Sequence, residues 1–183
     1  MRTLLSTLPF ERYTPRTYVY CHGDEMSLKA IALLESEKGT LTSTSSYTLL
    51  PLPRARKVGE SLPSTLISAT RTLFVALYRL FLLPFFQHPT RPFADVLLVN
   101  GPGTCVVLVL VSYIRRILGL RYTKIIYVES FARVKSLSLS GKLVEPFVDR
   151  LIVQWPNAGT GATSQDGGSD LGGGKVECRG WLV

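Results

Sequence analysis

Residue types that commonly build functional centres are scarce in this chain of 183 residues, which has only three cysteines and two histidines. Cys21, Cys105 and Cys178 are too few and show no paired spacing, so a disulfide scaffold is excluded. Neither His22 nor His88 stands in a cluster of cysteines and histidines, so we expect no metal site, and we expect no cofactor. A G-x-S-x-G elbow is also lacking, which removes the support for a Ser-His-Asp hydrolase.

Long uncharged apolar runs are missing as well. The short apolar start of the chain is followed at once by Pro9, Glu11 and Arg12, so no secretory signal is recognised. No run reaches the roughly 18–20 uncharged apolar residues of a membrane span. Even so, 46% of the residues are hydrophobic and the mean hydropathy is +0.21, which excludes disorder over most of the chain. These features predict a buried α/β sheet, a surface that contacts lipid, or both, in a reducing compartment.

Acidic residues are few in the middle of the chain. Residues 51–142 hold thirteen basic and three acidic side chains, a net charge of +10 against +8 for the whole chain. Such a positive field attracts phosphates of a nucleic acid, of lipid headgroups or of a pyrophosphate substrate. A solvated basic surface would have the same composition. Nucleic acid is disfavoured, because basic and aromatic residues do not interleave and no zinc-finger spacing is present.

Short apolar runs bounded by turn residues predict strands at residues 18–21, 47–50, 95–100, 124–129 and 150–155. Helices are predicted between them, at residues 24–35, 64–86, 104–118 and 141–147. This alternation predicts βαβ units in a doubly wound parallel sheet, whose strands are covered on both faces. The long apolar helix at 64–86 has Arg71 and Arg79 on roughly one face, which fits either a core helix or a helix at a membrane surface.

Two loops that follow predicted strands have the composition of ligand-binding loops. In the first, Asn100, Gly101 and Gly103 lead into a helix that begins at Thr104, so the backbone can approach a phosphate closely. The P-loop lysine is absent, and a simple tight turn explains these residues equally well.

The second loop begins at Glu129, which is followed by a run of hydroxyl and cationic side chains. Ser130, Arg133, Lys135 and Lys142 stand in this run, and a sugar pyrophosphate requires this combination of groups. Glu129 is the candidate to accept a proton from a sugar hydroxyl, although an ion pair with Arg133 is the alternative.

Seven segments in order along the chain resemble one known family. They are residues 12–18 (RYTPRTY), 23–24 (GD), 53–56 (PRAR), 100–104 (NGPGT), 127–134 (YVESFARV), 137–142 (LSLSGK) and 153–156 (VQWP). Together they resemble the family of asparagine-linked glycosylation protein fourteen, over nearly the whole chain except a glycine-rich stretch at residues 157–175. The NGPGT and ESFARV–LSLSGK segments are the most specific part of the resemblance.

The resemblance implies one half of a two-chain enzyme. Its fold would be the Rossmann-like parallel sheet of the N-terminal, acceptor-binding half of a GT-B glycosyltransferase. The partner, protein thirteen of the same pathway, would bind UDP-GlcNAc, and the pair would transfer GlcNAc to dolichyl-diphosphate-GlcNAc. The chain would act at the cytosolic face of the endoplasmic reticulum membrane, or at the nuclear envelope.

The resemblance also implies roles for individual residues. Asn100, Gly101, Gly103 and Thr104 would line the acceptor cleft; Glu129 would be the candidate catalytic residue, and Ser130, Arg133, Lys135 and Lys142 would flank the sugar or pyrophosphate of the acceptor. The apolar helix around residues 74–86 would lie at the membrane. The hydrophobic tail Trp181, Leu182 and Val183 would dock the partner subunit.

The family pattern normally starts with a membrane anchor, a first strand and a glycine-rich loop, and we expect these to be missing from this chain, with residues 1–9 as the rest of the first helix. The expected organisation is an acceptor domain at residues 1–156, a flexible glycine-rich insert at 157–175 and a strand-like tail at 176–183. The second hypothesis is a non-catalytic membrane-surface scaffold. A self-sufficient nucleotide-binding enzyme is disfavoured, because 183 residues leave no room for a second Rossmann half.

Overall fold

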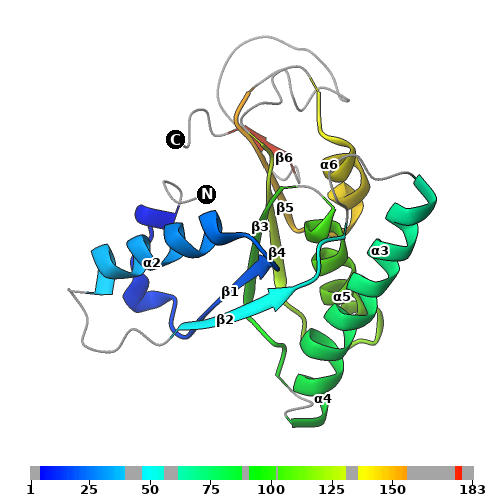
Figure 1. The fold of residues 1–183 in the computed structure, drawn as a ribbon, viewed down its shortest axis with the longest axis horizontal. Helices are drawn as coiled ribbons and strands as arrows, with labels where there is room; N and C mark the ends of the chain where they lie inside the picture. Colours follow the sequence, from blue (N-terminus) through cyan, green and yellow to red (C-terminus); the bar gives the residue numbers. More distant parts are fainter. Residues whose placement is uncertain are drawn as a thin grey trace. The chain divides into compact units, whose positions relative to one another are not determined.

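The computed structural model describes residues 5–39, 47–55, 62–87, 91–101, 103–130, 136–155 and the backbone of 176–178. The chain divides into two compact units, one within Met1–Arg54 and one within Ala55–Trp181. Each unit alternates strands and helices and contains a parallel sheet (Figure 1). The predicted α/β, Rossmann-like class is therefore confirmed.

The first unit is a βαβ unit. A short 3-10 turn, η1 (Phe10–Arg12), precedes β1 (Arg16–Cys21), which is followed by α2 (Glu25–Gly39) and β2 (Tyr47–Leu52). The two strands pair in parallel, with Arg16 opposite Tyr47 and Cys21 opposite Leu52. The predicted start of the helix is confirmed, because the Asp24 carboxyl group accepts hydrogen bonds from the N–H and hydroxyl of Ser27, at 3.1 and 2.8 Å.

A largely buried ion pair links β1 to α2 in this unit. The Arg16 guanidinium donates from Nε and Nη2 to the two carboxyl oxygens of Glu35, at 3.0 and 2.9 Å. The hydroxyl of Tyr18 donates to the same carboxyl group at 2.5 Å, and the guanidinium carbon lies 4.3 Å from the centroid of the Phe10 ring. Burial by itself would raise the pKa of Glu35, but the hydrogen bonds from Arg16 and Tyr18 lower it below its ordinary value.

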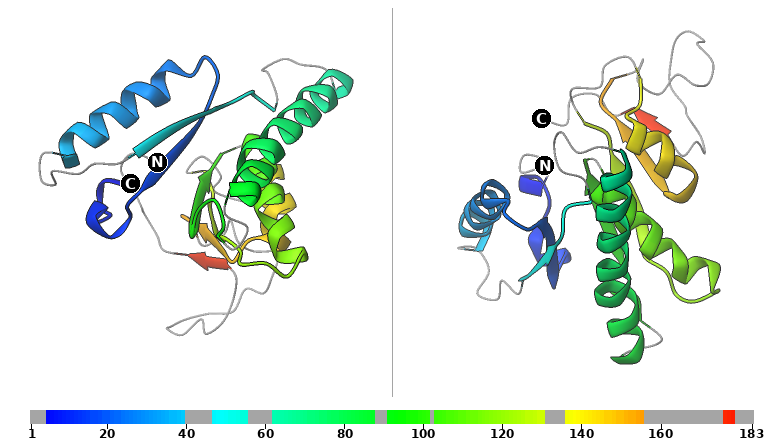
Figure 2. Two further views of the ribbon diagram at one scale, coloured as in Figure 1. Left: turned by 90° about the horizontal axis from the view of Figure 1, so that it is seen from below. Right: turned by 45° about the vertical axis from the view of Figure 1, so that its right-hand side comes forward.

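The second unit is built on a four-stranded sheet in the order β3 (Val96–Asn100), β4 (Lys124–Val128), β5 (Arg150–Val153) and β6 (Val176–Cys178), all parallel. Between the strands lie α5 (Thr104–Ile117), α6 (Leu139–Val144) and the 3-10 turn η3 (Glu145–Phe147). The helix α3 (Leu62–Ala76) packs on α5, and α5 packs on α6. Among the described elements of this unit, these helices cover one face of the sheet (Figures 1 and 2).

This arrangement differs from the predicted sheet with helices on both faces. Along β3, β4 and β5, buried residues alternate with more exposed ones, as in a sheet with one covered face. Each connection leads from one strand to its neighbour, always towards β6. Right-handed connections that all run the same way across a sheet place their helices on the same face of that sheet. The inner face carries Leu97, Val99, Ile125, Tyr127 and Leu151, all at most 7% exposed.

A long apolar helix runs through α3, the π-helical stretch η2 (Leu77–Leu82) and α4 (Leu83–Gln87). The N–H of Leu83 bonds to the carbonyl of Tyr78, five residues back, just before Pro84, which has no N–H to donate. Within it, Ile67–Gln87 is long and apolar enough to cross a membrane, by length and composition alone, although it contains Arg71 and Arg79; 22% of its apolar window is buried. Thr72, Ala76 and Leu80 form its buried stripe.

The strand and helix predictions hold with shifts of a few residues at their ends. The strands lie in two sheets, of two and four strands, among the described residues. The glycine-rich stretch 157–175 lies outside the described residues, as does most of the tail, from which the structure describes β6. Of the expected helical remnant at 1–9, the first four residues also lie outside. The single domain at 1–156 stays a prediction.

Candidate functional site

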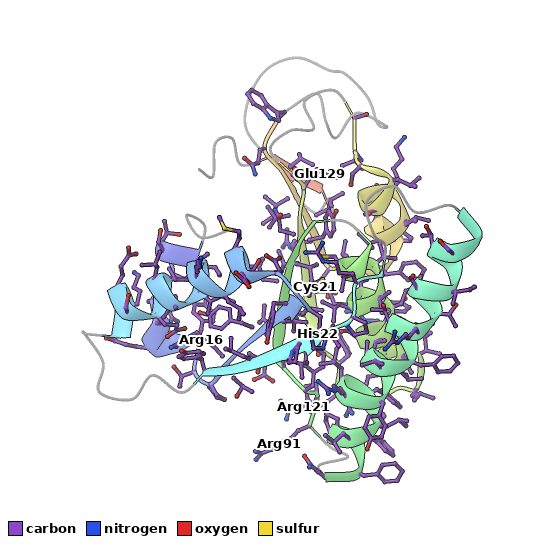
Figure 3. The ribbon with its side chains drawn as sticks, in the orientation of Figure 1. Arg16, Cys21, His22, Arg91, Arg121 and Glu129 are labelled. Carbon is purple, nitrogen blue, oxygen red and sulfur yellow. The ribbon has the colours of Figure 1, made fainter. Side chains whose placement is uncertain are left out.

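The carboxyl ends of β3, β4 and β5 meet at one edge of the four-stranded sheet. Asn100 lies opposite Val128, and Val128 lies opposite Ile152, so the loops after these strands are neighbours. Ligands of open α/β sheets bind at this edge. Figure 3 labels Glu129 at this end of the sheet, and Arg91 and Arg121 at the opposite end.

The loop after β3 needs glycine at one position. Gly101 has a φ of +124°, a backbone conformation that residues with a side chain rarely adopt. A Cβ there would lie 3.9 Å from Cys105 Sγ. A Cβ at Gly103 would meet Ala55 at an ordinary 3.6 Å. Thr104 begins α5, and its hydroxyl accepts a hydrogen bond from the N–H of Ala55 at 3.4 Å. The loop is thus held partly by contacts within the unit itself.

Glu129, the first residue after β4, is almost completely buried, with 1% of its surface exposed. Its Oε1 accepts a hydrogen bond from the N–H of Ser130 at 2.9 Å. Its Oε2 accepts from the N–H and the hydroxyl of Ser138, at 3.0 and 3.1 Å. A carboxylate offers about four acceptor positions, so one position at Oε1 remains for a further donor.

The first turn of α6 is built around this carboxyl group. Ser138 is the N-cap of the helix, and its hydroxyl accepts a hydrogen bond from the N–H of Gly141 at 2.9 Å. Gly141 is buried, and a Cβ there would lie 2.4 Å from Glu129 Oε2 and 3.2 Å from Ser138 Oγ. Glycine at 141 therefore makes room for the buried carboxyl group.

Tyr127 connects the two candidate loops. Its ring is 1% exposed, and its hydroxyl donates to the carbonyl of Gly101 at 3.2 Å and lies 3.4 Å from Ser138 Oγ. Burial raises the pKa of the tyrosine, partly offset by the Ser138 hydrogen bond. The tyrosine is therefore neutral at physiological pH, and acts as a hydrogen-bonding link between the ends of β3 and α6.

Gln154 follows β5 directly and is 7% exposed. Its Nε2 donates to the carbonyl oxygen of Glu129 at 3.4 Å, so its carboxamide lies against the end of β4. Its Oε1 is buried and accepts no hydrogen bond in the structure.

The structure brings Asn100, Gly101, Gly103, Thr104 and Glu129 to the same edge of the sheet, as predicted. Two further predicted residues are exposed there: Ser130 just after Glu129, and Lys142 in α6. The remaining predicted residues lie outside the described part of the chain; these are Arg133, Lys135, Trp181, Leu182 and Val183. Whether Glu129 pairs with Arg133 therefore stays open. The functional roles of all these predicted site residues stay predictions.

Several of the described basic residues lie away from this edge. Arg91, Arg121, Lys124 and Arg150 stand at or before the amino ends of the strands, on the opposite side of the sheet. Arg116 forms an ion pair with Asp149 at 2.5 Å. In the described ranges, no group of three or more His, Cys, Asp or Glu side chains is arranged to hold a metal ion.

Sequence reasoning did not assign roles to Tyr127, Ser138, Gly141 and Gln154. Three of them had a local signal. Ser138 followed three residues later by Gly141 at the start of a short helix is typical of an N-cap, and Gln154 stands in the VQWP segment. The position of Tyr127 in an apolar strand gave no sign that its hydroxyl bridges two loops.

Comparison with known proteins identifies relatives over most of the chain. The family model described as "Oligosaccharide biosynthesis protein Alg14 like" matches residues 1–166. The UDP-N-acetylglucosamine transferase subunit ALG14 of Cryptococcus neoformans var. neoformans serotype D (strain JEC21 / ATCC MYA-565) is 66% identical over 158 residues, which are 86% of this chain and 69% of the relative.

More distant relatives have the same name. The subunit from Yarrowia lipolytica is 42% identical over 85% of this chain and 67% of its own length. The subunit from Homo sapiens is 38% identical over 79% of this chain and 64% of its own length. No solved structure matches the chain significantly. On the evidence of the family model and these relatives, the chain belongs to the Alg14 family of oligosaccharide biosynthesis proteins.

Proposed function

We propose that this chain is the acceptor-binding and partner-recruiting subunit of the UDP-GlcNAc transferase that adds the second GlcNAc to dolichyl-diphosphate-GlcNAc. The membership of the chain in the Alg14 family carries this proposal, since the relatives are named as subunits of a UDP-N-acetylglucosamine transferase. A subunit requires a partner, and in this proposal the partner supplies the UDP-GlcNAc site.

The acceptor binds, in this proposal, at the carboxyl edge of β3, β4 and β5. Two features support that position: the loop at Gly101 and the loop at Glu129 meet there, and Tyr127 joins them through its hydroxyl. Asn100, Gly101, Gly103 and Thr104 line the acceptor, with Ser130, Arg133, Lys135 and Lys142 around its sugar and pyrophosphate. The exposed position of Lys142 in α6 suits a contact with phosphate.

A specific observation favours the second candidate function, a binding subunit with no catalytic residue of its own. Three of about four acceptor positions of the Glu129 carboxyl group are taken by Ser130 and Ser138. A general base needs a free position that faces the substrate hydroxyl. The two candidates therefore differ in whether the remaining position at Oε1 receives a proton during transfer.

The test uses the full chain co-expressed with its partner subunit. Co-purification and transfer of GlcNAc to dolichyl-diphosphate-GlcNAc are expected for the wild-type complex, and loss of co-purification is expected when residues 181–183 are deleted. Glu129→Gln keeps the shape of the side chain and removes its basicity, so a fall in kcat of a hundredfold or more at unchanged Tm supports a base. Unchanged kcat supports the binding subunit. A chain that neither binds the partner nor supports transfer refutes the proposal.

We further propose that the helix from α3 to α4 attaches the chain to the cytosolic face of the endoplasmic reticulum membrane, with the nuclear envelope as an alternative site. Its outer side exposes Ile67, Phe74, Tyr78 and Phe86, at 72%, 65%, 58% and 81%. Residues 62–87 contain no acidic side chain and two exposed arginines, Arg71 and Arg79, which suits anionic headgroups.

Vesicle flotation tests this attachment. Burial of an aromatic side chain contributes about 1.5–3 kcal/mol, so the double variant Phe74→Ser, Phe86→Ser is expected to bind vesicles that contain phosphatidylserine at least tenfold more weakly. Met26→Ser is the matched control, because Met26 is 76% exposed and lies in α2 of the other unit. Equal flotation of the double variant, the control and the wild type would exclude this helix as the attachment site.

A further inference from the structure

The structure leaves one buried polar atom at the candidate site without a hydrogen bond. Gln154 is 7% exposed, and its Oε1 has no partner. An unsatisfied buried acceptor is costly, because it has lost its water and gained nothing in return. Native proteins contain few such groups, so this one requires an explanation.

The Nη1 atom of Arg115, in α5 of the same unit, also makes no hydrogen bond, but the Nε of that guanidinium donates to the carbonyl of Arg121 at 2.9 Å. Two other buried polar side chains of this unit are hydrogen-bonded. Ser112 donates to the carbonyl of Leu108 at 2.8 Å, and Thr123 donates to the carbonyl of Ala94 at 2.7 Å. Gln154 differs from them in its position as well, since it lies at the carboxyl edge of the sheet, against the end of β4. This is the edge at which open α/β sheets bind their ligands.

We propose that Gln154 Oε1 accepts a hydrogen bond from a hydroxyl or amide N–H of the acceptor's sugar, and that it positions this sugar rather than the pyrophosphate. The inference rests on the proposed function. An amide oxygen can only accept, so its ligand must present a donor. A diphosphate diester presents only acceptors and negative charge, whereas a GlcNAc residue presents hydroxyls and an acetamido N–H.

The neighbouring carboxyl group leads to the same conclusion. Glu129 retains one acceptor position at Oε1, and the Nε2 of Gln154 is bonded to the carbonyl of the same glutamate. Two acceptors at the ends of adjacent strands fit a ligand with several hydroxyl groups. A pyrophosphate at this point would face the Glu129 carboxyl group, which opposes its negative charge.

The expected effect follows from the loss of one hydrogen bond to a buried acceptor. In the complex of the full chain with its partner, Gln154→Met should raise the KM for dolichyl-diphosphate-GlcNAc by roughly five- to a hundredfold. The KM for UDP-GlcNAc should not change. Thr123→Val is the matched control, because it also removes a buried polar group from this sheet, but at the opposite, amino-terminal edge.

A binding measurement on the same complex separates this inference from the proposed function. The probes are phytanyl-diphosphate-GlcNAc and phytanyl-diphosphate without the sugar, each in detergent. The wild type should gain Tm with both probes, and more with the sugar-bearing one. Gln154→Met should respond to both probes as the wild type responds to the sugarless one. Its own Tm should change little, because the variant removes an unsatisfied acceptor together with one long hydrogen bond, of 3.4 Å, to the carbonyl of Glu129.

The outcomes distinguish failure of this inference from failure of the proposed function. If Gln154→Met retains the extra gain in Tm from the sugar-bearing probe, or retains the wild-type KM for the acceptor, the inference is wrong and the proposed function stands. A lower Tm of the unliganded variant, with both KM values unchanged, would assign Oε1 to the structure itself. A wild-type complex that gains no Tm from either probe refutes the proposed function, and the inference with it.

Discussion

The packing of Gly141 against the Glu129 carboxyl group leads to a quantitative prediction. In Gly141→Ala, the new Cβ would lie 2.4 Å from Glu129 Oε2, a distance below 3.0 Å that Cβ atoms essentially never show. The carboxyl group or the first turn of α6 must therefore move by at least about 0.6 Å. Glu129 is buried and tied to Ser130 and Ser138, so this movement breaks hydrogen bonds instead of rotating a free side chain.

The size of the effect follows from the bonds at risk. A hydrogen bond to a charged group contributes about 1.5–3 kcal/mol, and the shift endangers the two bonds from Ser138. Alanine recovers about 1 kcal/mol relative to glycine through its helix propensity. We expect a net loss of about 2–5 kcal/mol, which corresponds to a fall in Tm of roughly 4–20 °C for a chain of this length.

Thermal and urea unfolding of the wild type and Gly141→Ala measure this loss. Leu139→Ala is the control, since Leu139 lies in the same helix and is 73% exposed, and it should change Tm by no more than about 2 °C. Glu129→Ala removes the atom that the new methyl group strikes. In a Glu129→Ala background, Gly141→Ala should therefore lower the free energy of unfolding only slightly. The effects of the two substitutions on this free energy should be clearly non-additive. Additive losses, or a Gly141→Ala protein with wild-type Tm, would refute the packing of α6 around this carboxyl group.

Two further predictions concern other parts of the fold. The pKa of Glu35 is lower in the folded chain than its ordinary 4.5. The stabilising contribution of the carboxylate is therefore complete above about pH 4.5 and is lost as the pH falls through the folded-state pKa. In acid unfolding, the free energy of unfolding should fall more steeply with pH for the wild type than for Glu35→Gln. Gly119 ends the turn after α5 with φ +67° and has no neighbour within 4 Å of a Cβ; Gly119→Ala should cost about 1 kcal/mol through backbone strain alone, and Gly119→Asn less, measured by urea unfolding.

The elements of this fold were predictable from the sequence because their signals are local. The β-branched runs of β3, β4 and β5, the cap at Asp24 and the glycine after α5 each act over a few residues. The family was predictable for a similar reason, since the NGPGT and LSLSGK segments are contiguous, and the Alg14 match confirms it. The pairing of strands into sheets of two and four was not predictable, because it depends on contacts between residues far apart in the sequence.

The candidate site was only partly predictable, because the same side chain can serve a ligand or the protein. The serines between Glu129 and Lys142 have the composition of a phosphate site. In the structure, the hydroxyl of Ser138 caps α6 and donates to Glu129, so it holds the loop and the helix together. No sequence pattern distinguishes a hydroxyl that binds a ligand from one that binds the backbone.

The distribution of charge indicates that the sugar and the phosphates of the acceptor occupy different places in the proposed site. The positive charge of residues 51–142 predicts attraction of phosphate, but Arg91, Arg121 and Lys124 lie at the far edge of the sheet, and Arg116 is paired with Asp149. The carboxyl edge itself presents Glu129 and Gln154, which are acceptors and suit a donor-bearing sugar.

A pyrophosphate bound at this edge therefore needs cations from the loop that follows Glu129. Lys142 is exposed in α6, and Arg133 and Lys135 stand in the sequence between the glutamate and that helix. Because Ser130 and Ser138 are both bonded to Glu129, the carboxyl group holds the residues on either side of the sequence that contains Arg133 and Lys135. In the proposed function, Glu129 contributes to phosphate binding because it holds Ser130 and Ser138 in place, whether or not it also accepts a proton.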